Sequence, residues 1–314
     1  MNGPVSDNRD AEAGVSRSVS ALVASVIDYA GLFPPAKLDM ASTVANHAAY
    51  LASEDEWMLN RLIMPASRLG EFEKAAEALL PRGEEDEPWL ISALTAPAGD
   101  AAALKADLAR IEAFNDAHGL PKAGLAMIDV IEMPADSAEA IEAALDTMPD
   151  ELFPFFELPA GTDPRGMITT LVGGEAGAKI RTGGEMAEAY PAADELARFI
   201  VACASADVPY KATAGLHHPL RHHAAGMGVK AFGFLNVFAA AALALHRELP
   251  VEEVVRVLEE EEAEAFVFDD EKLRWRHQRV GVEEIEDARL RQAVSFGSCS
   301  FDEPREGLRR LGLL

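Results

Sequence analysis

Two lysines occupy equivalent positions in consecutive strand-like segments of a chain that holds only eight lysines. Lys179 lies in the sequence AKIRTGG, which begins at residue 178, and Lys211 lies in YKATAG, which begins at residue 210. Burial and a neighbouring cation both disfavour the ammonium form of a lysine. The neutral amine that results can attack a carbonyl carbon and form a Schiff base. The pair therefore predicts covalent chemistry on a small carbonyl compound.

Carboxylates follow other strand-like segments and supply candidate acid and base groups. Asp28, Asp129 and Glu157 each lie near the predicted end of a strand, as do Glu132 and Asp269. Polar groups inside apolar strands cost several kcal/mol (~2–7) unless they are paired. The same residues could also form a plain structural network in which Glu157 or Asp129 neutralises the lysines. Both interpretations stay open.

A histidine-rich loop after Lys211 supports a different chemistry. His217 and His218 precede Pro219, and His222 and His223 follow it closely. Imidazole is a common ligand of divalent metals, and Glu157 or Asp269 could complete such a site. Adjacent histidines rarely bind one metal together, so general acid–base work or a solvated loop without a function are further interpretations. The prediction is no metal cofactor, with a divalent metal at His217, His218 and Glu157 as the alternative.

Several residues could bind an anionic part of a substrate. Gly226 and Gly228 precede an expected helix at 229–247, and backbone N–H groups at a helix N-terminus bind anions. Arg221 and Lys230 would add positive charge, and Arg181 lies two residues after the first lysine. A plain turn is the alternative for the two glycines. Together with His217 and His218, these are the predicted substrate-binding residues.

The two lysine segments resemble those of class I aldolases of the deoxyribose-phosphate aldolase type. That resemblance implies a barrel in which Lys179 is the nucleophile and Lys211 lowers its pKa, with Asp129 and Asp28 in acid–base positions. Arg181 departs from the pattern, which has a small residue there, and the histidines are not part of it. The sequences YAGLFPPA after Asp28 and KATAGLHHP at Lys211 also resemble a family of uncharacterised bacterial proteins. That second resemblance brings no activity with it.

The elements that must position these residues alternate between strand and helix. Strand-like runs lie at 25–29, 58–64, 89–94, 124–131, 152–158, 178–182, 208–214 and 265–268, with helical patterns between them. Strands and helices that alternate at this spacing predict βαβ units and a parallel sheet. Eight such units predict a single (β/α)₈ TIM-type barrel, with extra segments at both ends. An open doubly wound sheet is disfavoured because no G-x-G-x-x-G follows an early strand.

Composition limits the classes of partner. The formal net charge is −25, which argues against nucleic acid and anionic membranes. Such an acidic, lysine-poor surface is typical of a salt-adapted, halophilic protein. Two distant cysteines and the lack of an apolar leader favour the cytoplasm. We expect residues 1–16 to be a disordered tail and 17–314 to be one domain.

The leading hypothesis is a barrel enzyme, a class I aldolase-like lyase that acts on a small, anionic carbonyl compound through a lysine Schiff base. A metal-dependent isomerase or hydrolase is the first alternative, and a non-catalytic ligand-binding barrel is the second. The expected partner is a small-molecule substrate, and a homo-oligomer is allowed.

Overall fold

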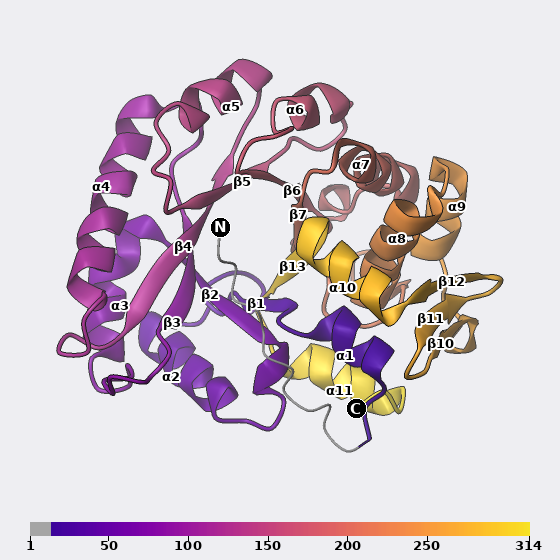
Figure 1. Cartoon of the computed structure of the whole chain (residues 1–314), viewed down its shortest axis with the longest axis horizontal. Coiled ribbons are helices and arrows are strands. Elements are labelled where there is room, and N and C mark those ends of the chain that lie inside the picture. Colours follow the sequence, from indigo (N-terminus) through magenta and orange to yellow (C-terminus); the bar gives the residue numbers. More distant parts are fainter. Residues whose placement is uncertain (1–13) are drawn as a thin grey trace.

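The computed structural model describes residues 14–314, so nearly all of the predicted tail, residues 1–13, lies outside the described residues. Eight parallel strands close into a barrel in the order β1-β13-β7-β6-β5-β4-β3-β2 (Figure 1). This confirms the predicted (β/α)₈ barrel. The barrel strands are β1 (Ile27–Tyr29), β2 (Leu59–Pro65), β3 (Trp89–Leu94), β4 (Ala126–Pro134), β5 (Phe153–Glu157), β6 (Gly177–Arg181), β7 (Tyr210–Thr213) and β13 (Ala293–Ser298).

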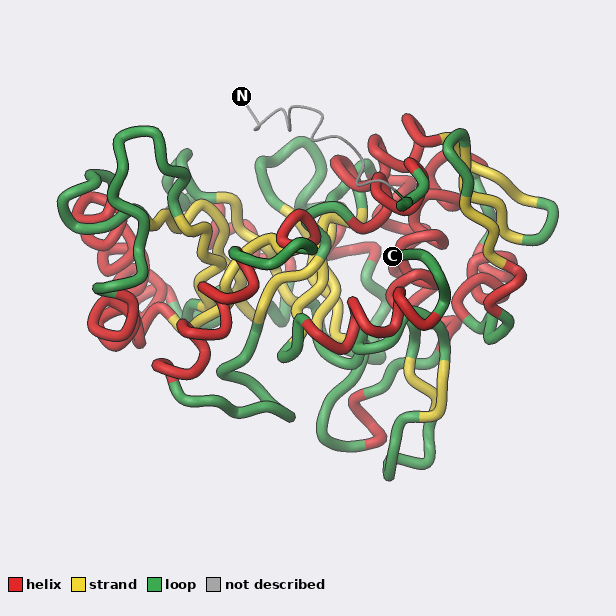
Figure 2. The backbone as a smooth tube through the Cα atoms, turned by 90° about the horizontal axis from the view of Figure 1, so that it is seen from below, coloured by secondary structure: helices red, strands yellow, loops and turns green. Residues whose placement is uncertain are grey.

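Helices surround the strands on the outside (Figure 1). The α-helices are α1 (Arg17–Val23), α2 (Met40–Leu51), α3 (Leu69–Ala76), α4 (Ala101–His118), α5 (Ala138–Leu145), α6 (Arg165–Thr169), α7 (Ala193–Ala206), α8 (Phe234–Arg247), α9 (Val251–Leu258), α10 (Val282–Arg291) and α11 (Asp302–Arg310). Short 3₁₀ turns are η1 (Glu56–Met58), η2 (Ala66–Arg68), η3 (Ala187–Ala189) and η4 (Ala263–Ala265). Viewed from the side, the strands lie in the middle of the molecule with helices on both sides (Figure 2).

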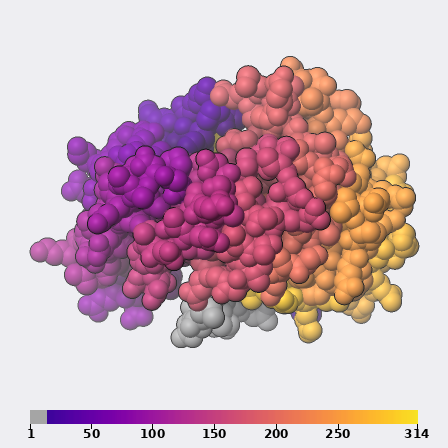
Figure 3. All heavy atoms as spheres, turned by 90° about the horizontal axis from the view of Figure 1, so that it is seen from above, coloured from indigo at the N-terminus to yellow at the C-terminus, as the bar shows by residue number. Residues whose placement is uncertain are grey.

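Consecutive units are neighbours in space, as short crossover connections require. On the face shown in Figure 3, the surface follows the order of the sequence from the N-terminal units to the C-terminal ones. Buried apolar residues from strands and helices form one continuous core. Helix α8 contributes most, since every residue from Phe234 to Ala244 is buried. Among the described residues, no helix is long and apolar enough to cross a membrane.

The predicted eighth strand is wrong. Residues 266–268 form β10 (Phe266–Phe268), which pairs in an antiparallel three-stranded sheet with β11 (Lys272–Trp275) and β12 (Gln278–Gly281) outside the barrel. The barrel closes instead through β13, which pairs with β1 and β7. Asp269 therefore lies in the turn between β10 and β11, where its side chain accepts hydrogen bonds from the backbone of Glu271 and Lys272.

The helix expected at 229–247 begins later than predicted. Two short strands, β8 (His222–His223) and β9 (Lys230–Ala231), pair antiparallel before α8 begins at Phe234. Gly226 and Gly228 lie in the turn that joins them, and both have positive φ angles. This change in the local fold bears directly on the predicted anion site.

Candidate functional site

The two lysines lie side by side inside the barrel. In the parallel pairing of β6 with β7, Lys179 is the direct register partner of Lys211. Both side chains are buried. Two ammonium groups in this position require compensating carboxylates, because an unpaired buried charge is very costly. Three carboxylates from β1, β4 and β5 surround them.

Glu132 on β4 bridges the two lysines. Its Oε2 atom lies 2.6 Å from Lys179 Nζ, and its Oε1 atom lies 2.5 Å from Lys211 Nζ. The Ser92 hydroxyl on β3 donates a hydrogen bond of 2.7 Å to Oε1. Burial raises the pKa of Glu132, but the charges of both lysines lower it more, so the net pKa lies well below the usual range. Glu132 is therefore a carboxylate between two ammonium groups.

Asp28 on β1 is the innermost of the three carboxylates around Lys179 and Lys211. Its Oδ2 atom lies 2.7 Å from Lys211 Nζ and accepts a hydrogen bond of 2.6 Å from the Ser295 hydroxyl on β13. Its Oδ1 atom accepts hydrogen bonds from the Asn60 amide group at 2.8 Å and from the backbone N–H of Arg61 at 3.1 Å. A carboxylate with both oxygens bound from three strands is fixed in position. Asp28 thus holds the ammonium of Lys211 in place.

Glu157 forms the outer end, where β5 ends. Its Oε2 atom lies 2.9 Å from Lys179 Nζ, and its Oε1 atom accepts hydrogen bonds from Arg181. Burial raises the pKa of Glu157, whereas the charges of Lys179 and Arg181 lower it, and the net pKa is lowered. The structure therefore brings together four of the five predicted catalytic residues, namely Asp28, Glu157, Lys179 and Lys211.

The expected net shift of the Lys179 pKa is wrong in sign. Burial lowers the pKa of Lys179, but the charges and contacts of Glu132 and Glu157 raise it more, so its net pKa lies above that of an ordinary lysine. The neighbouring ammonium of Lys211 is neutralised by its own carboxylates and does not set the balance. Lys179 is therefore an ammonium in the unliganded protein.

Asp129, the fifth predicted residue, contacts neither lysine. It receives two hydrogen bonds from the Arg61 guanidinium on β2, at 2.8 and 2.5 Å. Glu132, three residues further along the same strand, takes the place expected for Asp129. The two sites are still connected, because Arg61 donates to the Asn60 side chain, which in turn donates to Asp28.

The loops after the lysine strands are joined tightly. Thr182 is fully buried, and its hydroxyl donates to the backbone carbonyls of Thr213 and Ala214. Gly215 has a φ angle of +81°, and a Cβ atom on it would lie 2.9 Å from the carbonyl oxygen of Thr182 and 3.0 Å from the Cα atom of Gly183. Only glycine fits such a position at low cost. This close approach fixes the ends of β6 and β7 against each other.

The structure does not assemble the alternative metal site. His217 Nδ1 lies 2.8 Å from the carboxylate of Glu303 on α11. The ring of His218 instead contacts that of His222, and Glu157 is bound to Lys179 and Arg181. Across residues 14–314, no group of three or more histidine, cysteine, aspartate or glutamate side chains is placed to share a metal ion.

Gly226 and Gly228 do not precede a helix N-terminus, because both lie in the hairpin turn between β8 and β9, as the plain-turn alternative has it. Lys230 forms an ion pair of 2.5 Å with Glu261. The Arg221 guanidinium stacks over the Phe232 ring at 4.7 Å. These residues therefore support the local structure of the segment before α8.

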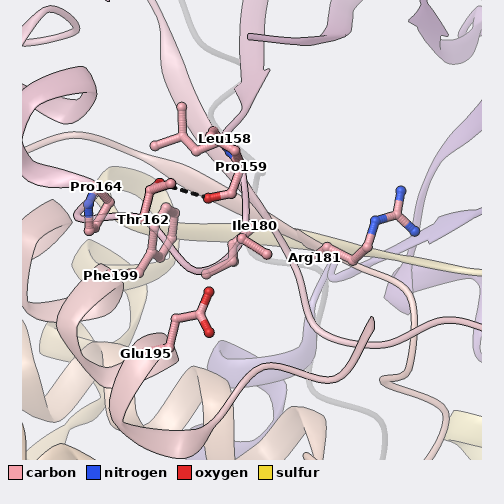
Figure 4. Close-up of a pocket in the computed structure, with 9 residues that line it drawn as sticks. Leu158, Pro159, Thr162, Pro164, Ile180, Arg181, Glu195 and Phe199 are labelled. Carbon is pink, nitrogen blue, oxygen red and sulfur yellow. Dashed lines mark hydrogen bonds between the residues drawn. The ribbon is translucent and has the colours of Figure 1, made fainter. Parts of the chain in front are cut away.

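Arg181 lies at the mouth of the barrel, at the last residue of β6. Arg181 is among the residues that line a small pocket, together with Thr162, Ile180, Glu195 and Phe199. In Figure 4 its side chain extends away from those residues. The guanidinium is turned toward Glu157 and is about half exposed. It is the cation of the cluster that solvent reaches most easily.

The polar residues that support the lysines and carboxylates are not among the predicted site residues. Ser92 and Ser295 lie inside the barrel at positions where an apolar residue would be the ordinary choice. For Ser92 the signal is a single serine within an otherwise apolar strand, whereas the strand of Ser295 also contains Gly297 and Ser298. Asn60 and Arg61 gave the same signal at the start of β2. In the sequence, Glu132 is only one of several carboxylates near a predicted strand end.

Comparisons with known proteins assign no family to the chain. No family model, no curated protein and no solved structure matches it. The two resemblances drawn from short sequence motifs stay predictions.

Proposed function

We propose that the protein is an enzyme that forms a Schiff base between Lys179 and a small, anionic carbonyl compound, and that it cleaves or forms a carbon–carbon bond. One observation carries this proposal. Lys179 is held between Glu132 and Glu157 on the solvent side of Lys211, two residues before the end of its strand. Active sites of (β/α)₈ barrels lie at the C-terminal ends of the strands.

The amine must lose a proton before it can attack. Both carboxylates beside Lys179 are within 2.9 Å of Nζ and can take that proton. Amine and carbonyl then give a carbinolamine, which loses water to give a protonated imine. That imine withdraws electrons from the neighbouring carbon–carbon bond, and the same carboxylates return protons to the products. Each step thus uses groups already in contact.

Lys211 has a supporting role in this scheme. Its ammonium is held by Asp28 and Glu132 and is deeper in the barrel than Lys179. It keeps Glu132 ionised and in place while Lys179 is transiently a neutral amine. A positive charge behind Glu132 therefore fixes this carboxylate beside Lys179.

Reductive trapping tests the proposal. The protein is incubated with a panel of small aldehydes and ketones, reduced with borohydride, digested and mapped by mass spectrometry. We expect an adduct on Lys179 that disappears in Lys179→Met. In the matched control Lys37→Met, which removes an exposed lysine paired with Glu185, the adduct should remain. An adduct that persists unchanged in Lys179→Met would refute the assignment.

A ligand-binding barrel without catalysis is the competing function. The raised pKa of Lys179 favours it, because a fully paired ammonium is what a structural ion network contains. That function predicts saturable binding of an anionic ligand with no trapped adduct on either buried lysine. Calorimetric titration of the compounds used for trapping separates the two.

A further inference from the structure

Six charged side chains form a chain of alternating sign from the barrel interior to its mouth. Its links are the contacts already described, from the carboxylate of Asp28 to the guanidinium of Arg181. Exposure rises along it: the side chains of Lys179, Glu157 and Arg181 are 7%, 20% and 48% exposed. A ligand that enters from solvent therefore meets Arg181 and Glu157 first. The members in order are Asp28, Lys211, Glu132, Lys179, Glu157 and Arg181.

Glu157 is shared between the two outermost cations. One oxygen, Oε2, lies 2.9 Å from the ammonium of Lys179, and the other, Oε1, lies 2.9 Å from Nη2 of Arg181. The charge of Arg181 helps to keep Glu157 ionised. If Arg181 takes another anion as its partner, that support weakens and Glu157 becomes a better proton acceptor for Lys179.

The Arg181 guanidinium has N–H groups that Glu157 does not use. Within residues 14–314, its side-chain hydrogen bonds run from Nε and Nη2 to a single oxygen of Glu157. Arginine presents five N–H donors in a planar fork that suits a carboxylate. A substrate carboxylate can therefore bind this fork at its exposed edge.

The spacing of the two cations indicates the class of substrate. One carboxylate, that of Glu157, already spans the gap between Arg181 and Lys179 with its two oxygens. In a 2-oxo acid the carbonyl carbon is bonded directly to the carboxylate carbon, so the two reacting groups span a similar distance. A longer compound would place its carbonyl beyond Lys179 when its anionic end is on Arg181.

We propose that the substrate is a short 2-oxo acid, and that its carboxylate binds the Arg181 guanidinium in place of Glu157, which then accepts the proton of Lys179 and frees the amine for attack. This inference rests on the proposed function. The nitrogen lone pair forms the carbon–nitrogen bond while the carbonyl π pair moves to oxygen. Glu157 returns its proton to that oxygen, which leaves as water together with a second proton from nitrogen. Ammonium and ketone thus give protonated imine and water, and Glu157 ends as a carboxylate.

Pyruvate and hydroxyacetone provide a matched pair of probes. They are methyl ketones of the same carbon number that differ in a carboxylate against a neutral hydroxymethyl group. We expect cyanoborohydride trapping on Lys179 to be at least about tenfold faster with pyruvate in the wild-type protein, since a charge-assisted contact contributes about 1.4 kcal/mol or more. In Arg181→Gln, trapping of pyruvate should slow and trapping of hydroxyacetone should quicken, so that the ratio falls to about one.

Two further variants make the result specific. Arg181→Lys keeps the charge without the fork and should give an intermediate ratio. Arg198→Gln removes an exposed arginine that is paired with Asp194 on α7, and it should leave the ratio unchanged. If Lys179 is trapped but the ratio in Arg181→Gln equals that of the wild type, this inference is refuted and the proposed function stands. If neither ketone labels Lys179 in any of these proteins, while circular dichroism shows them folded, this inference is refuted. The proposed function is refuted as well only if the whole panel of aldehydes and ketones leaves Lys179 unlabelled.

Discussion

Glu132 is the residue on which the charge balance of the barrel interior depends. It is the common partner of two ammonium groups, and it is buried together with them. Breaking a buried ion pair by removing one partner typically costs about 3–5 kcal/mol, because the remaining charge stays uncompensated. Here a single carboxylate compensates two charges. Its position therefore matters for stability and for the proton state of Lys179 alike.

His47 is another buried titratable group, outside the chain of charges that contains the lysines. Its ring on α2 lies between Tyr29 and Trp89, with ring centroids 6.4 and 4.9 Å away. Burial lowers the pKa of His47 to about 3. Between this pH and about 6.5, the ordinary pKa of histidine, the unfolded chain binds a proton that the folded protein does not. Stability must therefore fall as the pH falls through this window.

We expect His47→Phe, which keeps an aromatic ring in place, to remove this pH dependence. Relative to the variant, the wild-type protein should lose about 3 kcal/mol of unfolding free energy between pH 7 and pH 4, as a shift of several pKa units implies. Urea unfolding at a series of pH values measures the difference. The exposed His277→Gln serves as control and should follow the wild type. Parallel curves for His47→Phe and the wild type would contradict the prediction.

At the scale of elements, the closing strand shows where sequence patterns mislead. Residues 266–268 are a real strand, but it pairs antiparallel with β11 in a three-stranded sheet outside the barrel. β13, by contrast, contains Ser295, Gly297 and Ser298, which read as a polar loop. Ser295 donates a hydrogen bond to Asp28, which explains a polar residue at this position. That polar residue makes the strand hard to predict from hydrophobicity. Seven strands without this conflict could be predicted from apolar runs.

The prediction of Asp129, where the structure has Glu132 beside the lysines, also fails for a local reason. The register of β3 against β4 shifts at this point, since Ile91 pairs with Ile128 whereas Ser92 pairs with Val130. Asp129 is the extra residue of this irregularity, so simple alternation along the strand fails there. A bulge of this kind leaves no mark in a single sequence. The choice of carboxylate could not be made without the register.

The contact between the two lysine strands can be tested with a matched pair of glycine substitutions. Gly215 and Gly226 both have positive φ angles, +81° and +74°, but a Cβ atom would meet the backbone of Thr182 and Gly183 only at Gly215 and would meet open space at Gly226. Gly226→Ala should cost about 1–2 kcal/mol from the left-handed backbone alone. Gly215→Ala should cost about 1–3 kcal/mol more from overpacking. Equal losses in chemical denaturation would show that the two loops are not tightly joined.

At the scale of the whole molecule, the buried chain of charges is balanced, whereas the rest of the molecule carries an excess of negative charge. The six-member chain inside the barrel contains three cations and three carboxylates and is therefore neutral. The full sequence has 53 acidic against 28 basic residues, so the excess negative charge belongs to the remainder of the chain. Salt screens exposed charges strongly and buried pairs much less. Added salt should thus weaken the repulsion between surface charges without breaking the buried ion pairs of the six-member chain.

We expect the thermal midpoint of unfolding to rise steadily as KCl increases from low millimolar to molar concentration, because the screening length falls from about 30 Å at 0.01 M to about 3 Å at 1 M. Replacing the exposed Glu84, Glu85 and Glu87 with glutamine changes the net charge from −25 to −22. Since self-repulsion scales with the square of the charge, the salt-dependent rise should shrink by roughly a quarter. Sucrose at matched osmolality controls for effects on water activity. A midpoint that is flat or falls with KCl would show that surface repulsion does not limit stability, and the acidic composition would then need a cause other than adaptation to salt.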